Sequence, residues 1–353
     1  MREFGSEHPA VRLPDGYFEG FNHYGKCTWL RSGRETLHLV ALTLNPDHRH
    51  PVVLMPAYCC HSMVDPFEKA GWEVVYYRLH EDLTADLGHL TSLLVEKRPK
   101  AALTMDFFGS ASTFEAVSCI KNGCPDCVCI EDFSHCTFSL SRIYNARVDY
   151  YVTSIRKSVG VSDGSVIISK APLDESFVEE VDTEFVRARK ECQILKSEYA
   201  YSQRQEQKDV FFPELFRLER ELDAFVGVHR ISKAGKDMLS VLNGEMIGYA
   251  RRTNMEHLLA LLDGKVESVP GIEKCLEGAP FSLPILVKER DKVQQQFASR
   301  GLYAPVLWPI CEEARSICPV SARMADEMLS IPVDQRYNFD DIEEIAKIVV
   351  ETV

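Results

Sequence analysis

Two residues, Asp132 and Lys157, have the types and the placement of a catalytic pair. Asp132 follows the apolar, strand-like run 127–131, and Lys157 follows the similar run 149–153 after a short turn. A carboxylate can keep a pyridine nitrogen protonated, and a lysine amine can form a Schiff base with an aldehyde. Pyridoxal 5′-phosphate (PLP) requires both groups from a protein, so the pair predicts a PLP site in which Asp132 and Lys157 are catalytic.

Lys157 closes the turn Thr153-Ser154-Ile155-Arg156-Lys157, between two apolar runs. A lysine held near the protein interior loses solvation, which favours the neutral amine that imine chemistry needs, and Ser154 could donate a hydrogen bond to a phosphate. Two other interpretations stay open. Lys157 could be an exposed loop lysine, or Ser154 could be the nucleophile of a penicillin-recognising acyl hydrolase with a Ser-x-x-Lys site. Such a hydrolase needs further motifs, and the chain contains no Lys-Thr-Gly.

His135 follows Asp132 by three residues. Ligands of an open parallel sheet bind beyond the carboxyl ends of its strands, which is where Asp132 is expected to lie. His135 could hydrogen-bond the ring oxygen of the cofactor or a substrate carboxylate. The alternative is that Asp132 caps the following turn and that His135 is a structural histidine.

The segment Ser32-Gly33-Arg34-Glu35 predicts a helix start. Ser32 followed three residues later by Glu35 is a capping-box signature, and Gly33 leaves room for a ligand close to the backbone. The free N–H groups and the positive dipole end of such a helix attract an anion, so phosphate could bind there. The alternatives are that Ser32 simply caps the helix and that Arg34 is solvated or salt-bridged.

The composition limits the kinds of protein to consider. The chain has 353 residues, 45% of them hydrophobic, and a formal net charge of −13. This charge disfavours nucleic acids and anionic membranes as partners. No apolar stretch approaches the roughly 20 residues that span a bilayer, and residues 1–9 lack an apolar signal core. We therefore expect a soluble, cytoplasmic protein.

Twelve cysteines in a chain of this size are expected to be reduced thiols. Cys124 and Cys127 have the spacing of a zinc or redox pair. However, Cys127 and Cys129 would point to opposite faces of one buried strand and could not easily share an ion with Cys124. We therefore expect no metal.

Strand-like and helical patterns alternate with short connections, which predicts an α/β fold with a mostly parallel sheet. The expected strands cover residues 52–55, 73–77, 101–105, 127–131, 149–153 and 165–169. The expected helices cover residues 35–44, 62–70, 85–96 and 113–122. A charged segment of helical period, 174–226, follows and is expected to be interrupted at Pro213.

These patterns suggest an N-terminal segment (1–24), a large α/β domain (25–226) and a smaller C-terminal α+β domain (227–353). The smaller domain is predicted from helical patterns, an apolar segment and an acidic start to the last helix. In chain order these cover helical patterns over 236–262, a break at Pro270-Gly271, the apolar segment 281–287, a helix at 290–299 and a final helix at 338–353.

The order of several motifs resembles that of fold type I PLP-dependent enzymes, and more narrowly of the DegT/DnrJ/EryC1/StrS aminotransferases. The motifs are Ser32-Gly33-Arg34, Met55-Pro56-Ala57-Tyr58-Cys59-Cys60, Asp106-Phe107-Phe108-Gly109, Glu131-Asp132 and Ser154-x-x-Lys157. The segments 301–309 and 329–337 are similar to a small-domain strand of that family and to the residues that lead into its last helix. Each motif is weak by itself, but the shared order spans nearly the whole chain.

The resemblance implies an aminotransferase with PLP as cofactor and Lys157 as the Schiff-base lysine. Asp132 would pair with the pyridine nitrogen, His135 would lie near the ring oxygen, and the phosphate would be held at Gly33, Arg34 and Ser154, beside the cap Ser32. The amino donor would be glutamate and the acceptor a ketone or aldehyde, such as a sugar or sugar nucleotide. The family also implies a homodimer with the site at the interface. A PLP-dependent lyase or dehydratase and a non-catalytic protein of this fold stay open as alternatives.

The chain departs from the family at Cys60, which takes the position of an aromatic residue that commonly covers the cofactor ring. A thiol cannot supply a stacking face. Tyr58 or His61 could replace it, or the ring could be held differently. The spacing between Ser154 and Lys157 is shorter than in many members, and Ser165 stands where many have a glycine. These departures suggest an outlying branch whose substrate need not be a nucleotide sugar.

Overall fold

The computed structural model of the chain describes residues 3–10, 21–45, 47, 49–224 and 227–353. Two parts of the expected domain division lie outside the described residues. They are residues 1–2 and 11–20 of the expected N-terminal segment, and residues 225 and 226 at the expected boundary between the domains. No helix in the described part of the chain is long and apolar enough to cross a membrane.

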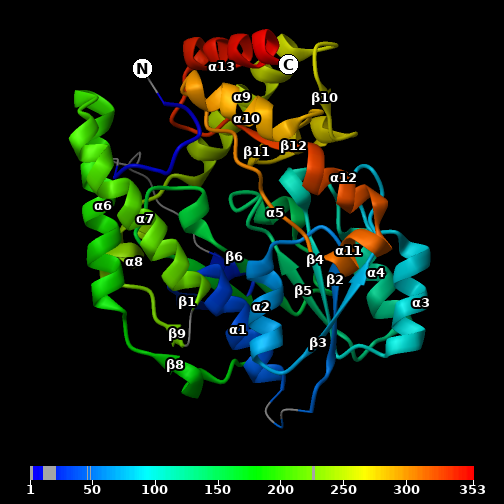
Figure 1. The fold of residues 1–353 in the computed structure, drawn as a ribbon. Helices are drawn as coiled ribbons and strands as arrows, with labels where there is room; N and C mark the ends of the chain where they lie inside the picture. The colour runs from blue at the N-terminus through cyan, green and yellow to red at the C-terminus, as the bar shows by residue number, and fades with distance from the viewer. Residues whose placement is uncertain (1–2, 11–20, 46, 48, 225–226) are drawn as a thin grey trace.

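A seven-stranded sheet forms the centre of the larger part of the molecule (Figure 1). Its strands are β1 (Lys26–Leu30), β2 (Val52–Pro56), β3 (Glu73–Tyr77), β4 (Ala101–Met105), β5 (Val128–Asp132), β6 (Tyr150–Thr153) and β7 (Ser165–Ser169), in the order β1-β7-β6-β5-β4-β2-β3. Strands β2 to β6 run parallel, and β7 is antiparallel to both of its neighbours. The predicted α/β fold with a mostly parallel sheet is therefore confirmed.

Four helices follow strands of this sheet: α1 (Gly33–Leu44), α2 (His61–Lys69), α3 (Leu87–Lys97) and α4 (Phe114–Gly123). The pair α1 and α2 packs together, and so does the pair α3 and α4. Every residue of β4, β6 and β7 is buried, as expected for strands covered on both faces. A short helix, α5 (Leu140–Ile143), and the 3₁₀ turns η1 (Phe21–His23), η2 (Phe107–Gly109) and η3 (Ile155–Lys157) complete this region.

The charged segment after β7 forms a helical hairpin of α6 (Thr183–Ser202) and α7 (Gln205–Asp223) with its own small core. The expected interruption at Pro213 is wrong, because Pro213 lies inside α7. The buried side chains Phe211, Leu215 and Leu218 hold the helix against α6 and outweigh the backbone hydrogen bond that proline lacks. The 3₁₀ turn η4 (Glu175–Phe177) and the two-residue strands β8 (Val178–Glu179) and β9 (Val228–His229) flank the hairpin.

The C-terminal part contains an antiparallel sheet of three strands, β10 (Glu267–Ser268), β11 (Ser282–Leu286) and β12 (Met328–Pro332). Its helical elements are α8 (Lys233–Ser240), α9 (Gly244–Leu262), η5 (Ile272–Glu277), α10 (Arg290–Ser299), α11 (Glu312–Ile317), α12 (Pro319–Glu327) and α13 (Phe339–Thr352). Helix α9 packs against α13, at the top of Figure 1. The capping box of Asn338 and Asp341 fixes the predicted start of α13.

The structure adds to or differs from the expected architecture in three places. The helical patterns over 236–262 form two helices, α8 and α9, because the side chain of Asn243 accepts a hydrogen bond from the Met246 N–H and starts a new helix. The segment 301–309 forms no strand and makes one isolated bridge, between Leu302 and Phe4. Strand β1 was not predicted at all, because only two of its five residues are fully buried.

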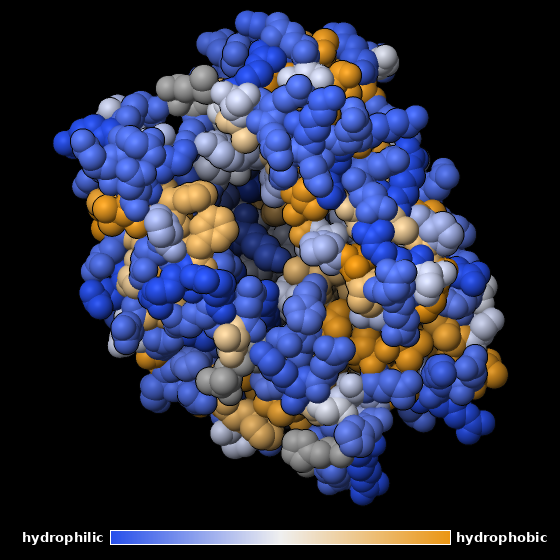
Figure 2. Space-filling view, viewed as in Figure 1, coloured by the Kyte–Doolittle hydropathy of each residue, from blue (hydrophilic) through white to orange (hydrophobic). Residues whose placement is uncertain are grey.

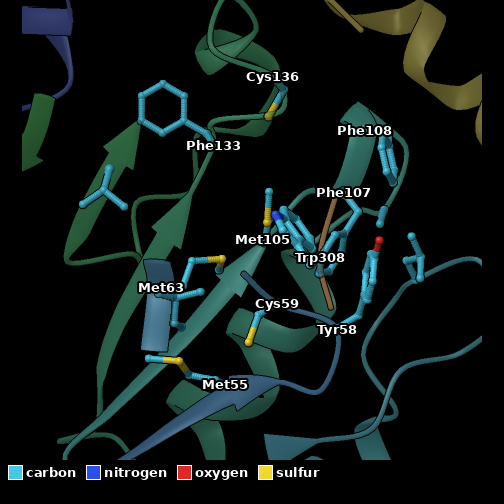
Figure 3. Packing of buried hydrophobic residues seen from close by; sticks show 14 of the residues in the cluster. Met55, Tyr58, Cys59, Met63, Met105, Phe107, Phe108, Phe133, Cys136 and Trp308 are labelled. Atoms are coloured by element: carbon cyan, nitrogen blue, oxygen red, sulfur yellow. The ribbon is translucent and has the colours of Figure 1, made fainter. Parts of the chain in front are cut away.

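One continuous hydrophobic core joins both sheets. Figure 3 shows part of it, in which Tyr58, Phe107 and Trp308 lie close together. The ring centroid of Trp308 is 4.9 Å from that of Tyr58 and 6.0 Å from that of Phe107. The late segment 301–309 therefore packs onto the end of the large sheet, where it can help to form a site.

Candidate active site

A cavity of about 300 Å³ opens where the carboxyl ends of β5 and β6 face the start of α1. Figure 2 shows the corresponding hollow in the middle of the molecule. Its wall includes the eight residues that the sequence assigned to the catalytic and cofactor-binding site, namely Ser32, Gly33, Arg34, Cys60, Asp132, His135, Ser154 and Lys157. The fold thus brings together residues from four separate parts of the chain.

Asp132 ends strand β5 and is buried at the floor of this cavity. Its Oδ1 accepts a hydrogen bond of 2.8 Å from the Ser134 N–H. Burial raises the pKa of Asp132, while the positive charge of Lys157 and the hydrogen bonds of Ser134 oppose that rise. A buried carboxylate whose charge depends on a nearby cation is well suited to bind a protonated ring nitrogen.

Ser154 and Gly33 bring the end of β6 and the start of α1 into contact. A Cβ added to Gly33 would lie 3.1 Å from the Cβ of Ser154, so a larger residue would push the two elements apart. The Ser154 N–H donates to Ser134 Oγ at 3.0 Å, which ties the same turn to Asp132. The residues therefore fit a phosphate, because a helix start, a hydroxyl and a close backbone approach meet at one place.

The start of α1 differs in detail from the expected capping box. Ser32 caps the helix, and its Oγ donates to Glu35 Oε2 at 2.7 Å. The Glu35 carboxylate also binds Arg31, with Nε at 3.0 Å, and His229, with Nδ1 at 2.9 Å. Glu35 is fully buried, so its charge is used to neutralise these basic groups instead of capping the backbone.

Arg34 forms an ion pair with Asp223 at the end of α7, where Nη1 lies 2.6 Å from Oδ1. Of the interpretations considered for the Arg34 side chain, the structure therefore shows the salt bridge. The guanidinium is engaged, which leaves the first backbone N–H groups of α1 as donors for an anion.

The turn η3 carries Lys157 and is held from several sides. Ile155 N and Arg156 N both donate to Gly164 O, and Arg156 binds Glu219 of α7 with both terminal nitrogens, at 2.9 and 3.1 Å. The expected desolvation of Lys157 is wrong for this chain, because the turn buries Ile155 and leaves the Lys157 side chain exposed. Lys157 lies at the junction of this cavity and a neighbouring one.

The geometry does not favour Ser154 as an acylating nucleophile. Such a serine needs a base within hydrogen-bond reach. Among the hydrogen bonds of the described residues, none joins Ser154 Oγ to Lys157 Nζ, and Ser154 is 3% exposed.

His135 is buried between aromatic rings. Its ring stacks on Phe281, with centroids 4.4 Å apart and planes 5° from parallel, and on Trp308 at 5.3 Å. The Phe108 N–H donates to Nδ1 at 3.3 Å. Burial, followed by the charge of Lys157, holds the pKa of His135 well below its usual value. The ring is therefore neutral, and Nε2 carries the proton that it can donate.

Cys60 lines the cavity at the start of α2, and its sulfur accepts a hydrogen bond from Ser62 Oγ at 3.0 Å. Neither of the suggested replacements for a stacking ring lines the cavity: Tyr58 is fully buried against Trp308, and His61 is exposed. The aromatic walls come instead from Phe281 and Trp308. Sequence reasoning missed both, although the resemblance of segment 301–309 contained Trp308.

A second cavity of about 230 Å³ adjoins the first and shares Arg156, Lys157, Phe281 and Pro305 with it. The N-terminal residue His8 also lines it, and the buried Nδ1 of His8 has no hydrogen-bond partner within the described ranges. Burial and the charge of Arg336 lower the pKa of His8 to about 3, so its ring is neutral.

Within the described residues, no three His, Cys, Asp or Glu side chains are arranged to hold a metal ion. Cys127 and Cys129 are buried, and burial raises the pKa of both thiols. All twelve cysteines are free thiols.

Comparison with known proteins supports the fold. No protein-family model matches the chain, and no curated protein matches its sequence. Solved structures do match along nearly the whole chain. PseC of Helicobacter pylori, an aminotransferase of pseudoaminic acid biosynthesis, is 12% identical, with 99% of each chain covered and a TM-score of 0.68.

Two other structures match similarly. A PLP form of Spr1654 from Streptococcus pneumoniae is 11% identical, with 99% of this chain and 100% of that chain covered and a TM-score of 0.65. A DegT/DnrJ/EryC1/StrS aminotransferase of Brucella abortus is 15% identical, with 93% and 86% covered and a TM-score of 0.64. The predicted fold type and the resemblance to this group of structures are thus confirmed at the level of the fold.

Proposed function

We propose that this protein is a PLP-dependent aminotransferase whose cofactor lies in the cavity between α1, β5 and η3. One observation carries the proposal: the eight residues suggested by the sequence, from four parts of the chain, line a single cavity. The fold is shared with aminotransferase structures and with a PLP form of Spr1654, which supports the same choice of cofactor.

Each residue would have a distinct task. The backbone N–H groups of Gly33 and Arg34 and the hydroxyl of Ser154 would hold the phosphate. The carboxylate of Asp132 would keep the pyridine nitrogen protonated, and the Nε2–H of His135 would donate to an oxygen of the cofactor or substrate. When bound, PLP supplies an aldehyde that condenses with amines and a ring that accepts electrons from the substrate carbon.

Lys157 would hold the cofactor in the resting enzyme and would move the proton during the reaction. Its Nζ would take the proton from the substrate carbon and return it elsewhere, as a general base and then a general acid. We propose glutamate as the amino donor and a ketone or aldehyde, such as a sugar or sugar nucleotide, as the acceptor. The walls of Phe281 and Trp308 would exclude water from the reacting carbon.

The absorbance spectrum of the purified protein tests this assignment. With PLP added, we expect a band characteristic of a lysine-bound cofactor that is absent in Lys157→Ala. Lys233→Ala is a matched control, because the Lys233 side chain is 88% exposed and far along the chain. A band that persists in Lys157→Ala would refute the assignment of the lysine.

Addition of L-glutamate then separates aminotransfer from the alternatives. An aminotransferase loses the band stoichiometrically and releases 2-oxoglutarate, and a keto acceptor restores the band. A lyase would release ammonia, and a dehydratase would release a dehydrated product. In both cases the absorbance band would be the same before and after turnover. A non-catalytic protein would show no change with any amine.

We also propose a homodimer in the cytoplasm. Phe212 and Phe216 of α7 are 47% and 57% exposed, and exposed aromatic side chains of this kind are typical of interaction surfaces. The twelve free thiols suit a reducing compartment. Sedimentation analysis is expected to give about twice the 40.1 kDa mass of the chain. A species of one chain mass at micromolar concentration would contradict the dimer.

A further inference from the structure

We infer that Arg251 and Gln335 are positioning residues for Lys157, and that they hold its turn against the C-terminal part of the molecule. The inference rests on the proposed function, since it concerns the lysine that would carry the cofactor. Neither side chain takes a direct part in the proposed reaction.

The two side chains converge on one carbonyl oxygen next to Lys157. Arg251 Nη2 donates to Ser158 O at 3.0 Å, and Gln335 Nε2 donates to the same oxygen at 2.9 Å. Arg251 Nε donates to Gln335 Oε1 at 2.9 Å and closes a triangle of hydrogen bonds. We call this arrangement of Arg251, Gln335 and the Ser158 carbonyl the carbonyl clamp.

Arg251 is buried in α9 and is bonded entirely to neutral groups. It is 2% exposed, and no carboxylate in the described ranges lies within 4.0 Å of it. Asp334 is near enough to favour its charge but is paired with Arg336. Burying a guanidinium without a direct counterion costs free energy unless its hydrogen bonds are satisfied. The hydrogen bonds that stabilise the buried guanidinium therefore also fix the positions of the carbonyl groups that accept them.

The same guanidinium also fixes the aromatic wall of the site. Arg251 Nη1 donates to Pro280 O at 3.1 Å and to Phe281 O at 3.2 Å. The Phe281 ring stacks on His135 at 4.4 Å, beside Asp132. One side chain thus sets the lysine turn and the wall of the cavity relative to each other.

The clamp links two parts of the molecule. The turn itself donates hydrogen bonds to Ser134, Gly164 and Glu219, all of which precede residue 228. Among the hydrogen bonds of the described ranges, those donated by Arg251 and Gln335 join residues 154–158 to the chain beyond residue 227. Without them, the turn would keep its fold but lose its fixed distance to the C-terminal wall.

The rate of bond formation with PLP reports the position of Lys157 directly. In this step Nζ adds to the aldehyde carbon and one water leaves, so that a C=N bond replaces the C=O bond. Rapid mixing of PLP with the full chain freed of cofactor separates an encounter equilibrium from this first-order step. The encounter depends on the phosphate and Asp132 contacts, whereas the first-order step depends on where the amine lies.

We expect Arg251→Lys and Gln335→Met each to slow the first-order step about tenfold or more, while the encounter dissociation constant changes less than about twofold. Lysine keeps the charge but cannot bridge two acceptors, and methionine keeps the size of Gln335 but not its hydrogen bonds. Arg252→Lys is the matched control, because Arg252 is the next residue on α9 and donates to Gly278 O at 3.3 Å, away from the turn. It should leave both constants unchanged.

Two results would overturn the inference. One is a wild-type first-order rate in Gln335→Met, the variant that retains the fold if the buried Arg251 does not tolerate replacement. The other is a loss of encounter affinity and thermal stability equal to the loss of rate, which would indicate a purely structural role. If the wild-type chain forms no band that depends on Lys157, the proposed function fails and the clamp with it. If the band forms and only the clamp variants behave as wild type, the clamp alone fails.

Discussion

Three acidic side chains, Asp106, Glu131 and Asp132, crowd the carboxyl ends of β4 and β5. Burial raises the pKa of Glu131 to about 8 and that of Asp106 to about 7, whereas Lys157 counteracts the rise at Asp132. Glu131 accepts hydrogen bonds from Thr104 and from Thr113, the latter at 2.9 Å. The neighbouring carboxyl groups thus differ in protonation state. Glu131 is mostly protonated at neutral pH, whereas Asp132 is the group that can carry a negative charge beside the cofactor.

Glu131→Gln should flatten the pH dependence of stability. The folded pKa of about 8 lies above the model-peptide value of 4.5, so between these values the folded state retains a proton that the unfolded state has released. The free energy of unfolding therefore falls as the pH rises through this window, by up to about 1.4 kcal/mol per pH unit for this group. Glutamine imitates the protonated form and removes that contribution.

Urea denaturation between pH 5 and 8 measures this effect. The slope of the unfolding free energy against pH should be smaller for Glu131→Gln than for wild type. Glu96→Gln is the control, since the Glu96 side chain is 66% exposed. Equal slopes for wild type and Glu131→Gln would show that Glu131 is ionised when folded.

At the scale of elements, the contact between α1 and the end of β6 decides whether phosphate can bind. Gly33→Ala would place a methyl group 3.1 Å from Ser154 Cβ, closer than such groups normally approach. We expect the dissociation constant of PLP to rise about tenfold, equivalent to about 1.4 kcal/mol. The free energy of unfolding should change little, because the roughly 0.5–1 kcal/mol that alanine gains over glycine in a helix offsets the cost of this close contact.

A PLP titration followed by absorbance tests this prediction. Gly88→Ala is a suitable control, because Gly88 lies at the second position of α3 and its new methyl would meet only the flexible Asp86 carboxylate, at 3.3 Å. An unchanged PLP affinity in Gly33→Ala would mean that the α1–β6 contact does not shape the phosphate site.

The elements around this contact were predictable because their signals are local. The bounds of α1 to α4 and of β2 to β7 were predicted to within two residues, since each element has a regular apolar period or a continuous apolar run. Asp132 and Lys157 follow such runs, so their placement at strand ends could be inferred. Local signals failed where a distant partner decides the structure, as for Pro213, which the core between α6 and α7 keeps helical.

The remaining parts of the site depend on contacts between distant residues. Arg34 is held by Asp223, which lies 189 residues away, and Phe281 covers His135 from the other part of the chain. Neither pairing can be inferred from the spacing of residues that are close in the sequence. One sequence can predict which residues end strands, but it cannot predict which side chain from another element will stack on them.

At the scale of the whole molecule, the described N-terminal residues 3–10 tie distant parts of the structure together. Arg336 Nη1 donates to Ser6 O at 2.9 Å, Arg189 Nη2 donates to Glu7 at 2.7 Å, and the Gly5 N–H donates to Tyr337 Oη at 2.7 Å. The segment therefore joins α6 to the residues that precede α13, and it places His8 in the second cavity. The expected N-terminal segment thus contributes to the surroundings of Lys157.

The Asp334–Arg336 pair is the anchor of this segment, and its energy can be measured. Two hydrogen bonds of 2.7 Å join the side chains. Burial alone would raise the pKa of Asp334, but the Arg336 guanidinium holds it well below the usual range. Arg336→Gln would leave a buried carboxylate without its partner, and we expect a loss of about 3–5 kcal/mol in unfolding free energy at pH 7.

A double-mutant cycle with Asp334→Asn separates the pair from the segment it anchors. The double variant should recover part of the loss, because no unpaired charge then stays buried, whereas additive losses would show that the two residues act independently. The folded pKa of Asp334 is depressed, so the contribution of the pair is complete above the unfolded value near 3.9 and declines as the pH falls below it. Urea denaturation at pH 7 and at about pH 3 should therefore give a smaller difference between wild type and Arg336→Gln at the lower pH. Arg336 Nη1 also donates to Glu7 O at 3.3 Å. An equal difference at both pH values would mean that Arg336 stabilises the molecule only through its hydrogen bonds to the backbone carbonyls of Ser6 and Glu7.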